Sequence, residues 1–240
     1  MSSKSHFFRQ QDGVFWSFSY YKFENNGNDS VGTNHGTVTG GVSYVNDANL
    51  AGLSMKTLLG THYMDIPDSD DFSFTDGAGN DTACTIAFSY KCNKTTQQWF
   101  VNKRSDLGSN QEWWCLHNGS QFYFAFHDNT TGGQINVKYV TPLVIGNYYH
   151  IVITYDGSGV QGGITMYVND VDVSTRGIIG AYNGMSNTTA PVRVAQTGWG
   201  IAGNNVDGLI DSLAFYNTEA TPSQATDIYN KLINKIELAW

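Results

Sequence analysis

The chain has few basic residues and no basic cluster. Thirteen Lys and Arg residues stand against 21 Asp and Glu residues, and the formal net charge is −8. Nucleic acids and anionic membranes attract proteins through clustered Lys and Arg side chains. We therefore expect neither nucleic acid nor a membrane surface as a partner.

Long apolar runs and a cysteine framework are missing too. No run of 18 apolar residues exists, so no membrane-spanning helix is expected. The three cysteines show none of the spacings that are typical of zinc sites. Cys84 and Cys92 fall on one face of a predicted strand, roughly 26 Å apart, which is too far for a disulfide. A bridge from Cys115 to one of them stays open, but we favour three reduced core cysteines.

What the chain does contain is typical of an all-β protein. It has 26 Gly, 14 Tyr, 13 Phe and 6 Trp residues, and aromatic residues favour strands while Gly favours turns. Apolar residues alternate with polar ones in several segments, beginning near Val14 and recurring at 122–126, 151–155 and 164–168. Polar turn clusters separate these segments. The pattern predicts a two-sheet antiparallel jelly-roll sandwich.

One helix is expected at the C-terminus. Thr221 is an N-cap candidate, Pro222 fits the first helical position, and Gln224 completes a capping box. Ala225, Ile228, Leu232 and Ile236 then recur at helical spacing. We expect an N-terminal arm over residues 1–13, the sandwich over 14–220, and the helix over 221–240.

Five motifs in order resemble the LamG-like (laminin G-like jelly roll) domains of the concanavalin A-like lectin/glucanase superfamily. The first is an aromatic strand that ends at Glu24 and leads through an Asn/Gly/Asp/Ser loop to Asn34-His35-Gly36. The others are segments 63–74, 148–157, 166–171 and 206–217. The resemblance implies a concanavalin A-like sandwich, and a function among sugar binders, hydrolases and structural modules.

The carboxylates do not fit the hydrolases of this superfamily. Laminarinase-type enzymes carry Glu-x-Asp-x-x-Glu on one strand, and retaining hydrolysis needs two carboxyl groups about 5 Å apart. The only Glu residues are Glu24, Glu112, Glu219 and Glu237, and Glu112 begins a strand without the other two acids. We expect no enzymatic activity, and structural roles for His35 and His150.

The resemblance also implies a structural calcium ion. Many relatives hold one between the opening loop and the terminal strand, and the matching positions are Glu24, Asp29 and Asp211. Carboxylate and carbonyl oxygens from separate loops suit calcium. The alternative is that Asp211 caps backbone groups or pairs with a basic residue, and that Glu24 is a surface residue.

Sugar binding needs an exposed aromatic ring beside planar polar groups. Trp199 lies between two glycines in a Gly/Asn-rich loop, and Arg193, Gln196, Asn204 and Asn205 lie near it in the sequence. These five residues form the predicted carbohydrate site. In the alternative, Trp199 folds back and closes one end of the sandwich. The adjacent Trp113 and Trp114 should point to opposite faces of a strand.

The leading hypothesis is a non-catalytic surface module that binds glycans or a protein scaffold such as a viral shell. No secretory signal is visible at the N-terminus, and we expect a virion protein, for example a capsid decoration or tail protein. A fragment of a larger secreted protein is the alternative for location. For function, the alternatives are a hydrolase-like enzyme with an unrecognised site, or an assembly protein that docks through Phe7-Phe8 and Trp240.

Overall fold

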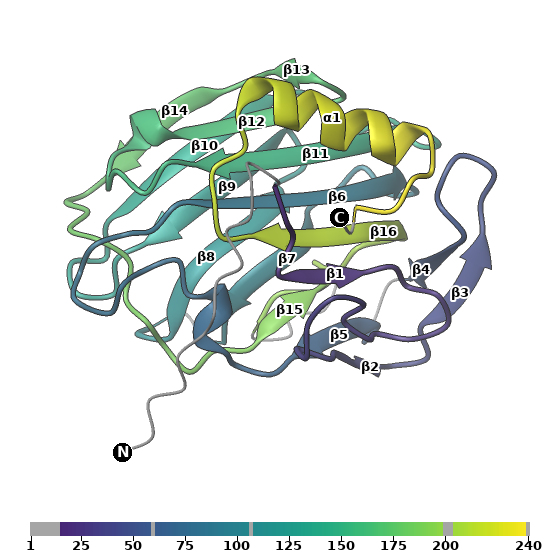
Figure 1. Ribbon diagram of the computed structural model, residues 1–240, viewed down its shortest axis with the longest axis horizontal. Coiled ribbons are helices and arrows are strands. Elements are labelled where there is room, and N and C mark those ends of the chain that lie inside the picture. Colours follow the sequence, from purple (N-terminus) through teal and green to yellow (C-terminus); the bar gives the residue numbers. More distant parts are fainter. Residues whose placement is uncertain (1–14, 59–60, 106–107, 199–203, 239–240) are drawn as a thin grey trace.

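Two antiparallel sheets form a sandwich in the computed structural model, which describes residues 15–58, 61–105, 108–198 and 204–238 (Figure 1). Sheet A has the order β13-β12-β11-β6-β16-β4-β3, and β1 pairs with β16. Sheet B has the order β14-β10-β9-β8-β7-β15-β5-β2. The all-β jelly-roll prediction is confirmed, and the strands begin at Ser19 and end at Tyr216.

The strands of sheet A are β1 (Ser19–Tyr21), β3 (Ser43–Asn46), β4 (Leu53–Thr57), β6 (Cys84–Cys92), β11 (Tyr148–Tyr155), β12 (Ile164–Val168), β13 (Val171–Asp172) and β16 (Gly208–Tyr216). Those of sheet B are β2 (Thr37–Thr39), β5 (Tyr63–Ile66), β7 (Gln98–Arg104), β8 (Gln111–His117), β9 (Gln121–His127), β10 (Gln134–Val140), β14 (Thr175–Ile179) and β15 (Val192–Val194). Short 3-10 turns, η1 (Asp70–Phe72) and η2 (Gln161–Gly163), lie in the connections.

The main core lies between the sheets and follows the predicted alternation. The inward side chains of β9 are Phe122, Phe124 and Phe126, and all three are fully buried. The predicted inward residues of β11 and β12 join the same cluster: Ile151, Ile153, Tyr155, Ile164, Met166 and Val168. Trp113 faces this core, whereas Trp114 belongs to a separate cluster on the outer face of sheet B. The cysteines are free and buried, as predicted.

The first strand is shorter than predicted. Pairing with β16 begins where the Phe18 amide donates to the carbonyl of Phe215 at 2.9 Å, and β1 itself starts at Ser19. Trp16 is 45% exposed, so the segment before β1 does not continue the alternation. Phe15 packs instead on Tyr216, with ring centroids 4.3 Å apart.

The helix α1 (Pro222–Ile233) lies across the outer face of sheet A, against β11 and β6 (Figure 1). Its capping box between Thr221 and Gln224 is present as predicted. Ala225, Ile228 and Leu232 pack on the sheet, but Ile236 is 53% exposed.

The expected helix over 221–240 is therefore too long, because a Schellman motif ends it at Ile233. Lys235 has the left-handed φ of +58°, and the Ile236 amide donates to the Lys231 carbonyl at 2.8 Å. The chain then turns back, and Leu238 is buried in the cluster beneath α1.

Candidate functional site

The outer face of sheet B carries a row of polar and aromatic side chains that neighbour one another across five strands. Asn102 of β7 pairs with Arg193 of β15 on one side and with Trp114 of β8 on the other. Trp114 pairs with Ala125 of β9, which pairs with Asn136 of β10. Opposed residues on one face have Cβ atoms about 5 Å apart, so the row is contiguous. Arg193 is half-buried and the other members of the row are buried.

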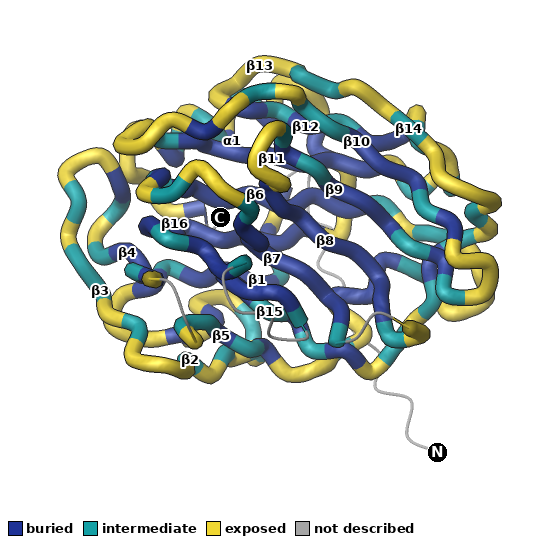
Figure 2. The backbone as a smooth tube through the Cα atoms, turned by 180° about the vertical axis from the view of Figure 1, so that it is seen from behind, coloured by how far each residue is buried: buried dark blue, intermediate teal, exposed yellow. Residues whose placement is uncertain are grey.

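A second row lies beside it. The apolar and aromatic side chains of the two rows pack together, and we call them the outer-face cluster: Trp99, Trp114, Leu116, Tyr123 and Ala125. Trp99 pairs with Leu116, which pairs with Tyr123. The Arg104 guanidinium lies 4.5 Å from the ring centroid of Trp114 and 5.2 Å from that of Trp99. Figure 2 shows β7 and β8 as continuous tracts of buried positions on this side of the molecule, while β9 also has intermediate positions.

The cluster has a closed centre and a more open rim. Trp99 and Trp114 are only 5% and 7% exposed, while Tyr123 and His127 are half-buried. His127 contacts Trp114 with ring centroids 5.6 Å apart. Burial lowers the pKa of His127, as does the charge of Arg104, so the imidazole is neutral at physiological pH.

Arg193, a predicted sugar contact, lies at one end of the first row. Its guanidinium binds both carboxylate oxygens of Asp65 at 2.7 Å and stacks 4.1 Å from the ring centroid of Tyr63. It also donates to the side chain of Gln196 and to the carbonyls of Thr197 and Gly198. Arg193 therefore has a structural role, because its hydrogen bonds hold the start of the loop that follows β15.

Gln196 and Asn205, two other predicted contacts, are buried at 4% and 0% exposure. The Asn205 side chain donates to the carbonyl of Leu58, and the backbone carbonyl of Asn205 accepts from Lys94 Nζ at 2.8 Å. The amide of Asn205 thus faces the interior, which corrects the expectation that it meets a ligand. Asn204 is half-buried, and its carbonyl accepts from the Trp99 amide at 3.0 Å.

Trp199, the centre of the predicted site, lies outside the described residues. The described ends of its loop are held together, because the Val206 amide donates to the Ala195 carbonyl at 2.8 Å. Gly198 also packs closely on β7: a Cβ built there would lie 1.4 Å from the Arg104 carbonyl oxygen. The loop therefore starts and ends beside the outer-face cluster.

Asp29, one of the three predicted calcium ligands, is occupied by protein donors. Its Oδ1 accepts from the amides of Tyr20, Val31 and Gly32, and its Oδ2 from Ser19 Oγ and the Asn34 amide. The nearby His35 ring accepts from the Asp29 amide at 3.1 Å. Five donors use the lone pairs of this carboxylate, so Asp29 organises the loop and does not fit the role of a metal ligand.

Glu24 and Asp211 fit a cation better, since both face the turn between β3 and β4. Glu24 Oε1 accepts from the Leu53 amide at 3.0 Å, and Asp211 Oδ2 from the Ala51 amide at 2.9 Å. Asp211 is 1% exposed and its Oδ1 has no hydrogen-bond partner. Burial, with a smaller contribution from the charge of Glu24, raises the pKa of Asp211 to about 7.

No group of three or more His, Cys, Asp or Glu side chains gathers as a metal site within the described ranges. A calcium ion at Glu24 and Asp211 would therefore need backbone carbonyls for the rest of its oxygen shell. The orphaned Asp211 oxygen and the two neighbouring carboxylates are the features that fit such an ion.

His150 does not face a groove, because α1 covers it. Its ring contacts Tyr229 of the helix edge-on at 5.8 Å between centroids, and its Nδ1 is 2.9 Å from Ser89 Oγ. Burial lowers its pKa to about 4. The expected structural role agrees with this position.

Two features of the site were not predicted from the sequence. Alternation indicated that one of Trp113 and Trp114 points outward but not which one, and nothing in the sequence placed Trp99 and Arg104 against Trp114. Glu112 was considered only as a catalytic acid, whereas it forms an ion pair with Lys103 at 2.8 Å in the interior. The available signal was the position of Lys103 two residues after Val101, on the same side of a strand by alternation.

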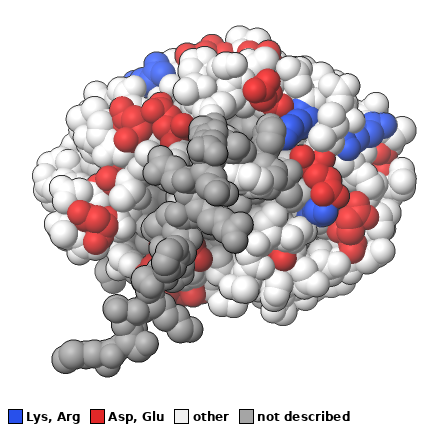
Figure 3. All heavy atoms as spheres, in the orientation of Figure 1, with Lys and Arg blue, Asp and Glu red and all other residues white. Residues whose placement is uncertain are grey.

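Of the described part of the chain, no helix has the length and apolar character to cross a membrane. Figure 3 shows acidic groups scattered over the visible face around sheet A and α1, with only a few basic groups among them. This distribution agrees with the charge of the whole sequence.

Solved structures with this fold include carbohydrate- and receptor-binding domains. Domain 4 of AbnA, a GH43 extracellular arabinanase from Geobacillus stearothermophilus, in complex with arabinotriose, is 19% identical with a TM-score of 0.61, covering 90% of this chain and 98% of that domain. The receptor-binding domain of botulinum neurotoxin C/D mosaic serotype is 11% identical with a TM-score of 0.68, covering 89% of this chain. That of type G is 12% identical with a TM-score of 0.62, covering 89%. The chain spans 51% of each of these two neurotoxin domains.

No curated protein sequence matches the chain significantly. A family model matches residues 60–226, more than half of the chain, and it describes the fold that the two sheets display. The chain is a member of the concanavalin A-like lectin/glucanases superfamily.

Proposed function

We propose that the protein is a non-catalytic glycan-recognition module that binds sugars on the outer face of sheet B, over the outer-face cluster. The observation that carries the proposal is the pair of rows in which two indoles neighbour a guanidinium and an imidazole, with the half-buried Tyr123 at the rim. Sugar rings stack on aromatic faces through their C–H groups, and planar polar side chains bind their hydroxyl groups.

The rim of the cluster provides the contact surface. Tyr123 and His127 are half-buried, and Lys138 pairs with Tyr123 at the side of β10. The buried centre of Trp99, Trp114 and Arg104 holds these side chains in place. A rigid aromatic support lowers the entropy that binding would otherwise cost.

The lack of paired carboxylates on this face supports a non-catalytic role. Within the described residues of the two rows and their cross-strand partners, the one carboxylate is that of Asp65, and both of its oxygens bind Arg193. Glycoside hydrolysis uses two carboxyl groups at a defined separation. An enzyme with a differently placed site is the alternative, and product analysis distinguishes the two.

Arabino-oligosaccharides are the first ligands to test. The similar arabinanase domain was solved in complex with arabinotriose, and a protein with a net charge of −8 suits a neutral sugar better than a sulfated or acidic one. We propose display on a virion or another outward-facing surface as the setting, following the sequence expectation. Its test is labelling of intact particles with an antibody to the protein.

We also propose a structural calcium ion between Glu24, Asp211 and the turn that ends at Leu53. Asp29 has no part in it, because its oxygens are already bonded. When bound, the ion would neutralise the two carboxylates and fasten the N-terminal segment to β16. The features that support it are the unpartnered Asp211 oxygen and the close approach of Glu24, whose Oε1 would lie 1.7 Å from a Cβ on Gly52.

The experiment for the glycan proposal is calorimetric titration of arabino-oligosaccharides and other neutral glycans into wild type, Tyr123→Ala and Tyr167→Ala. Both tyrosines are half-buried, but Tyr167 lies on the outer side of sheet A, against the cluster beneath α1. Removing a stacking ring costs more than about 1 kcal/mol at a binding hot spot, which weakens binding by about tenfold. We expect this loss for Tyr123→Ala only.

Equal weakening by both substitutions would contradict the proposed face. Release of shorter sugars from the ligand during the titration would show that the protein is an enzyme. If the wild-type protein bound no glycan from a broad array, the remaining alternative would be an assembly protein without a ligand. The aromatic residues assigned to that role, Phe7, Phe8 and Trp240, lie outside the described residues.

A further inference from the structure

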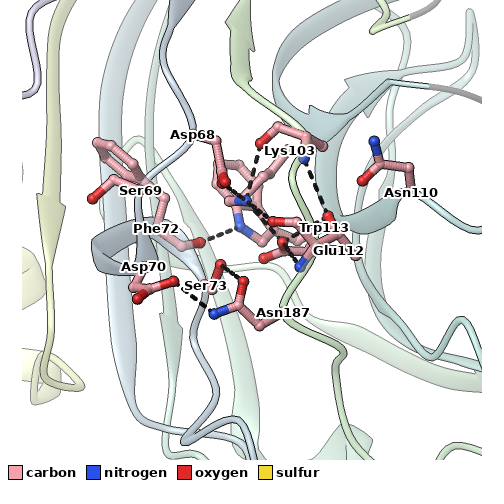
Figure 4. A network of polar contacts seen from close by, with 12 residues as sticks. Asp68, Ser69, Asp70, Phe72, Ser73, Lys103, Asn110, Glu112, Trp113 and Asn187 are labelled. Carbon is pink, nitrogen blue, oxygen red and sulfur yellow. Dashed lines mark hydrogen bonds and ion pairs between the residues drawn. The ribbon is translucent and has the colours of Figure 1, made fainter. Parts of the chain in front are cut away.

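A fully buried lysine lies between two carboxylates on the core-facing side of sheet B. Lys103 Nζ is 2.7 Å from Asp68 Oδ1 and 2.8 Å from Glu112 Oε1, and the side chains of Lys103 and Glu112 have no exposed surface (Figure 4). The carbonyls of Thr188 and Ala190 approach Nζ at 3.2 and 3.0 Å. Four oxygen atoms thus surround a nitrogen that has at most three N–H bonds.

The local fold explains why these side chains meet. Lys103 pairs with the core residue Trp113, so it points into the sandwich, and Glu112 sits in the register irregularity that follows this pair. Asp68 comes two residues after β5 and lies 35 residues before Lys103. Trp113 and Phe72 are fully buried beside the network, and the Trp113 indole N–H donates to the Phe72 carbonyl at 2.8 Å (Figure 4).

Glu112 is held as a group that can carry a proton. Its Oε1 accepts from the amide and hydroxyl of Thr188 at 2.7 and 2.8 Å, while its buried Oε2 has no hydrogen-bond partner. Burial raises the pKa of Glu112, although the charge of Lys103 counteracts it. A carboxyl group with one free oxygen beside an amine is suited to general acid–base work.

Charged side chains in this buried position carry an unfavourable free energy of desolvation. A buried ion pair loses the solvation of both partners, and their attraction often fails to offset that loss. An amide between the lysine and one carboxylate would remove both charges from the interior. Fixed neighbours at hydrogen-bond distance also react as though at very high concentration, with effective molarities of about 10⁵–10⁸ M.

We propose that Lys103 and Asp68 condense in the folded protein to an intramolecular isopeptide bond, with Glu112 transferring the proton. Lys103 Nζ first passes one proton to Asp68, which gives a neutral amine and a carboxylic acid. The amine attacks Cγ of Asp68, and Glu112 takes a second proton from the nitrogen. Glu112 then returns that proton to the departing Asp68 oxygen. One N–C bond forms, one C–O bond breaks, one water molecule leaves, and Glu112 ends as it began.

Asp68 provides the route for the water that is released, because its side chain is 36% exposed while Lys103 and Glu112 are not. The new bond would join the segment that follows β5 to β7 and close a loop between positions 35 residues apart. Such a bond limits the unfolded chain as a disulfide does, in a protein whose cysteines are free.

The chain contains an internal control for this chemistry. Lys91 Nζ is also 2.7 Å from a carboxylate oxygen, that of Asp47, but the two side chains are 27% and 12% exposed. Tyr148 is the further partner of Asp47, at 2.8 Å, so a hydroxyl group replaces the second carboxyl group. We expect no condensation there.

The test is the intact mass of the denatured protein, after incubation in the folded state, with peptide mapping. We expect wild type to weigh one water molecule less than its sequence and to give a branched peptide containing residues 68 and 103. Asp68→Ala, which keeps the Lys103–Glu112 pair, should show its full sequence mass. Asp68→Asn should reach the wild-type cross-linked mass by losing ammonia.

Glu112→Gln should retain its full mass although Lys103 and the Asp68 acceptor are both present. If that variant does not fold, the Asp68→Ala and Asp68→Asn pair still decides the question. Full sequence mass for wild type, or a missing water that persists in Asp68→Ala or maps to Lys91 and Asp47, would overturn the proposal.

Discussion

At the scale of single residues, four carboxylates have different roles, which follow from their hydrogen-bond and ion-pair partners. Asp29 is saturated by five donors, Asp65 is paired with Arg193, and Glu112 is paired with Lys103. Asp211 and Glu112 each have a buried oxygen without a hydrogen-bond partner, but only Glu112 is also paired with a lysine. Because a buried carboxylate without a partner is costly, Asp211 is the residue at which a proton or cation has the largest effect on stability.

The raised pKa of Asp211 predicts that the free energy of unfolding depends on pH. Its pKa of about 7 is above the ordinary value of 3.8, so the folded state binds the proton more tightly than the unfolded chain. The resulting stabilisation is fully present below pH 3.8 and is lost as pH rises through 7. In chelator, the unfolding free energy of wild type should fall relative to Asp211→Asn across this range in denaturant titrations.

Calcium should restore the lost stability at high pH in wild type only. Binding to the folded state adds about 2.7 kcal/mol at a hundredfold excess over the dissociation constant, so chelation should lower the melting temperature of wild type and leave Asp211→Asn unchanged. Asp29→Asn should still respond to calcium if it folds. A wild-type melting curve that chelator does not move would contradict the calcium site.

At the scale of elements, the sequence predicts the features that repeat with a strand or helix period. It does not predict the features that depend on contacts between distant parts of the chain. The inward Phe residues of β9 and the capping box of α1 follow from alternation and spacing, which one sequence displays. The end of α1 does not, because Lys235 adopts a left-handed φ that favours Gly. The ion pairs of Lys103 with Asp68 and of Arg193 with Asp65 were also not predicted, since these partners lie 35 and 128 residues away in the sequence.

The helix terminus predicts that Lys235→Gly stabilises the protein. A non-glycine residue in the left-handed region costs about 1 kcal/mol, and the bonds that end α1 come from the backbone and do not need the lysine side chain. We expect a gain of up to about 1 kcal/mol in denaturant unfolding. Lys235→Ala is the matched control, because it removes the side chain but keeps Cβ; an equal gain in both variants would refute the explanation.

At the scale of the whole molecule, β16 joins elements from both ends of the chain. It pairs with β6, β4 and β1, and its side chains enter both the main core and the cluster beneath α1. Removal of residues 206–217 should abolish cooperative folding, because it opens the centre of sheet A and exposes the edges of its neighbours. A soluble truncation with a cooperative melting transition would contradict this arrangement.

The central claim is that the outer face of sheet B binds glycans, and NMR of the indole N–H groups tests it most directly. Trp99 and Trp114 lie in the outer-face cluster and Trp113 faces the core. Trp16 is exposed and lies in the segment before β1. Titration with an arabino-oligosaccharide or another glycan that binds should shift the signals of Trp99 and Trp114 and leave that of Trp16 in place. Saturable binding that shifts Trp16 but neither Trp99 nor Trp114 would contradict the account.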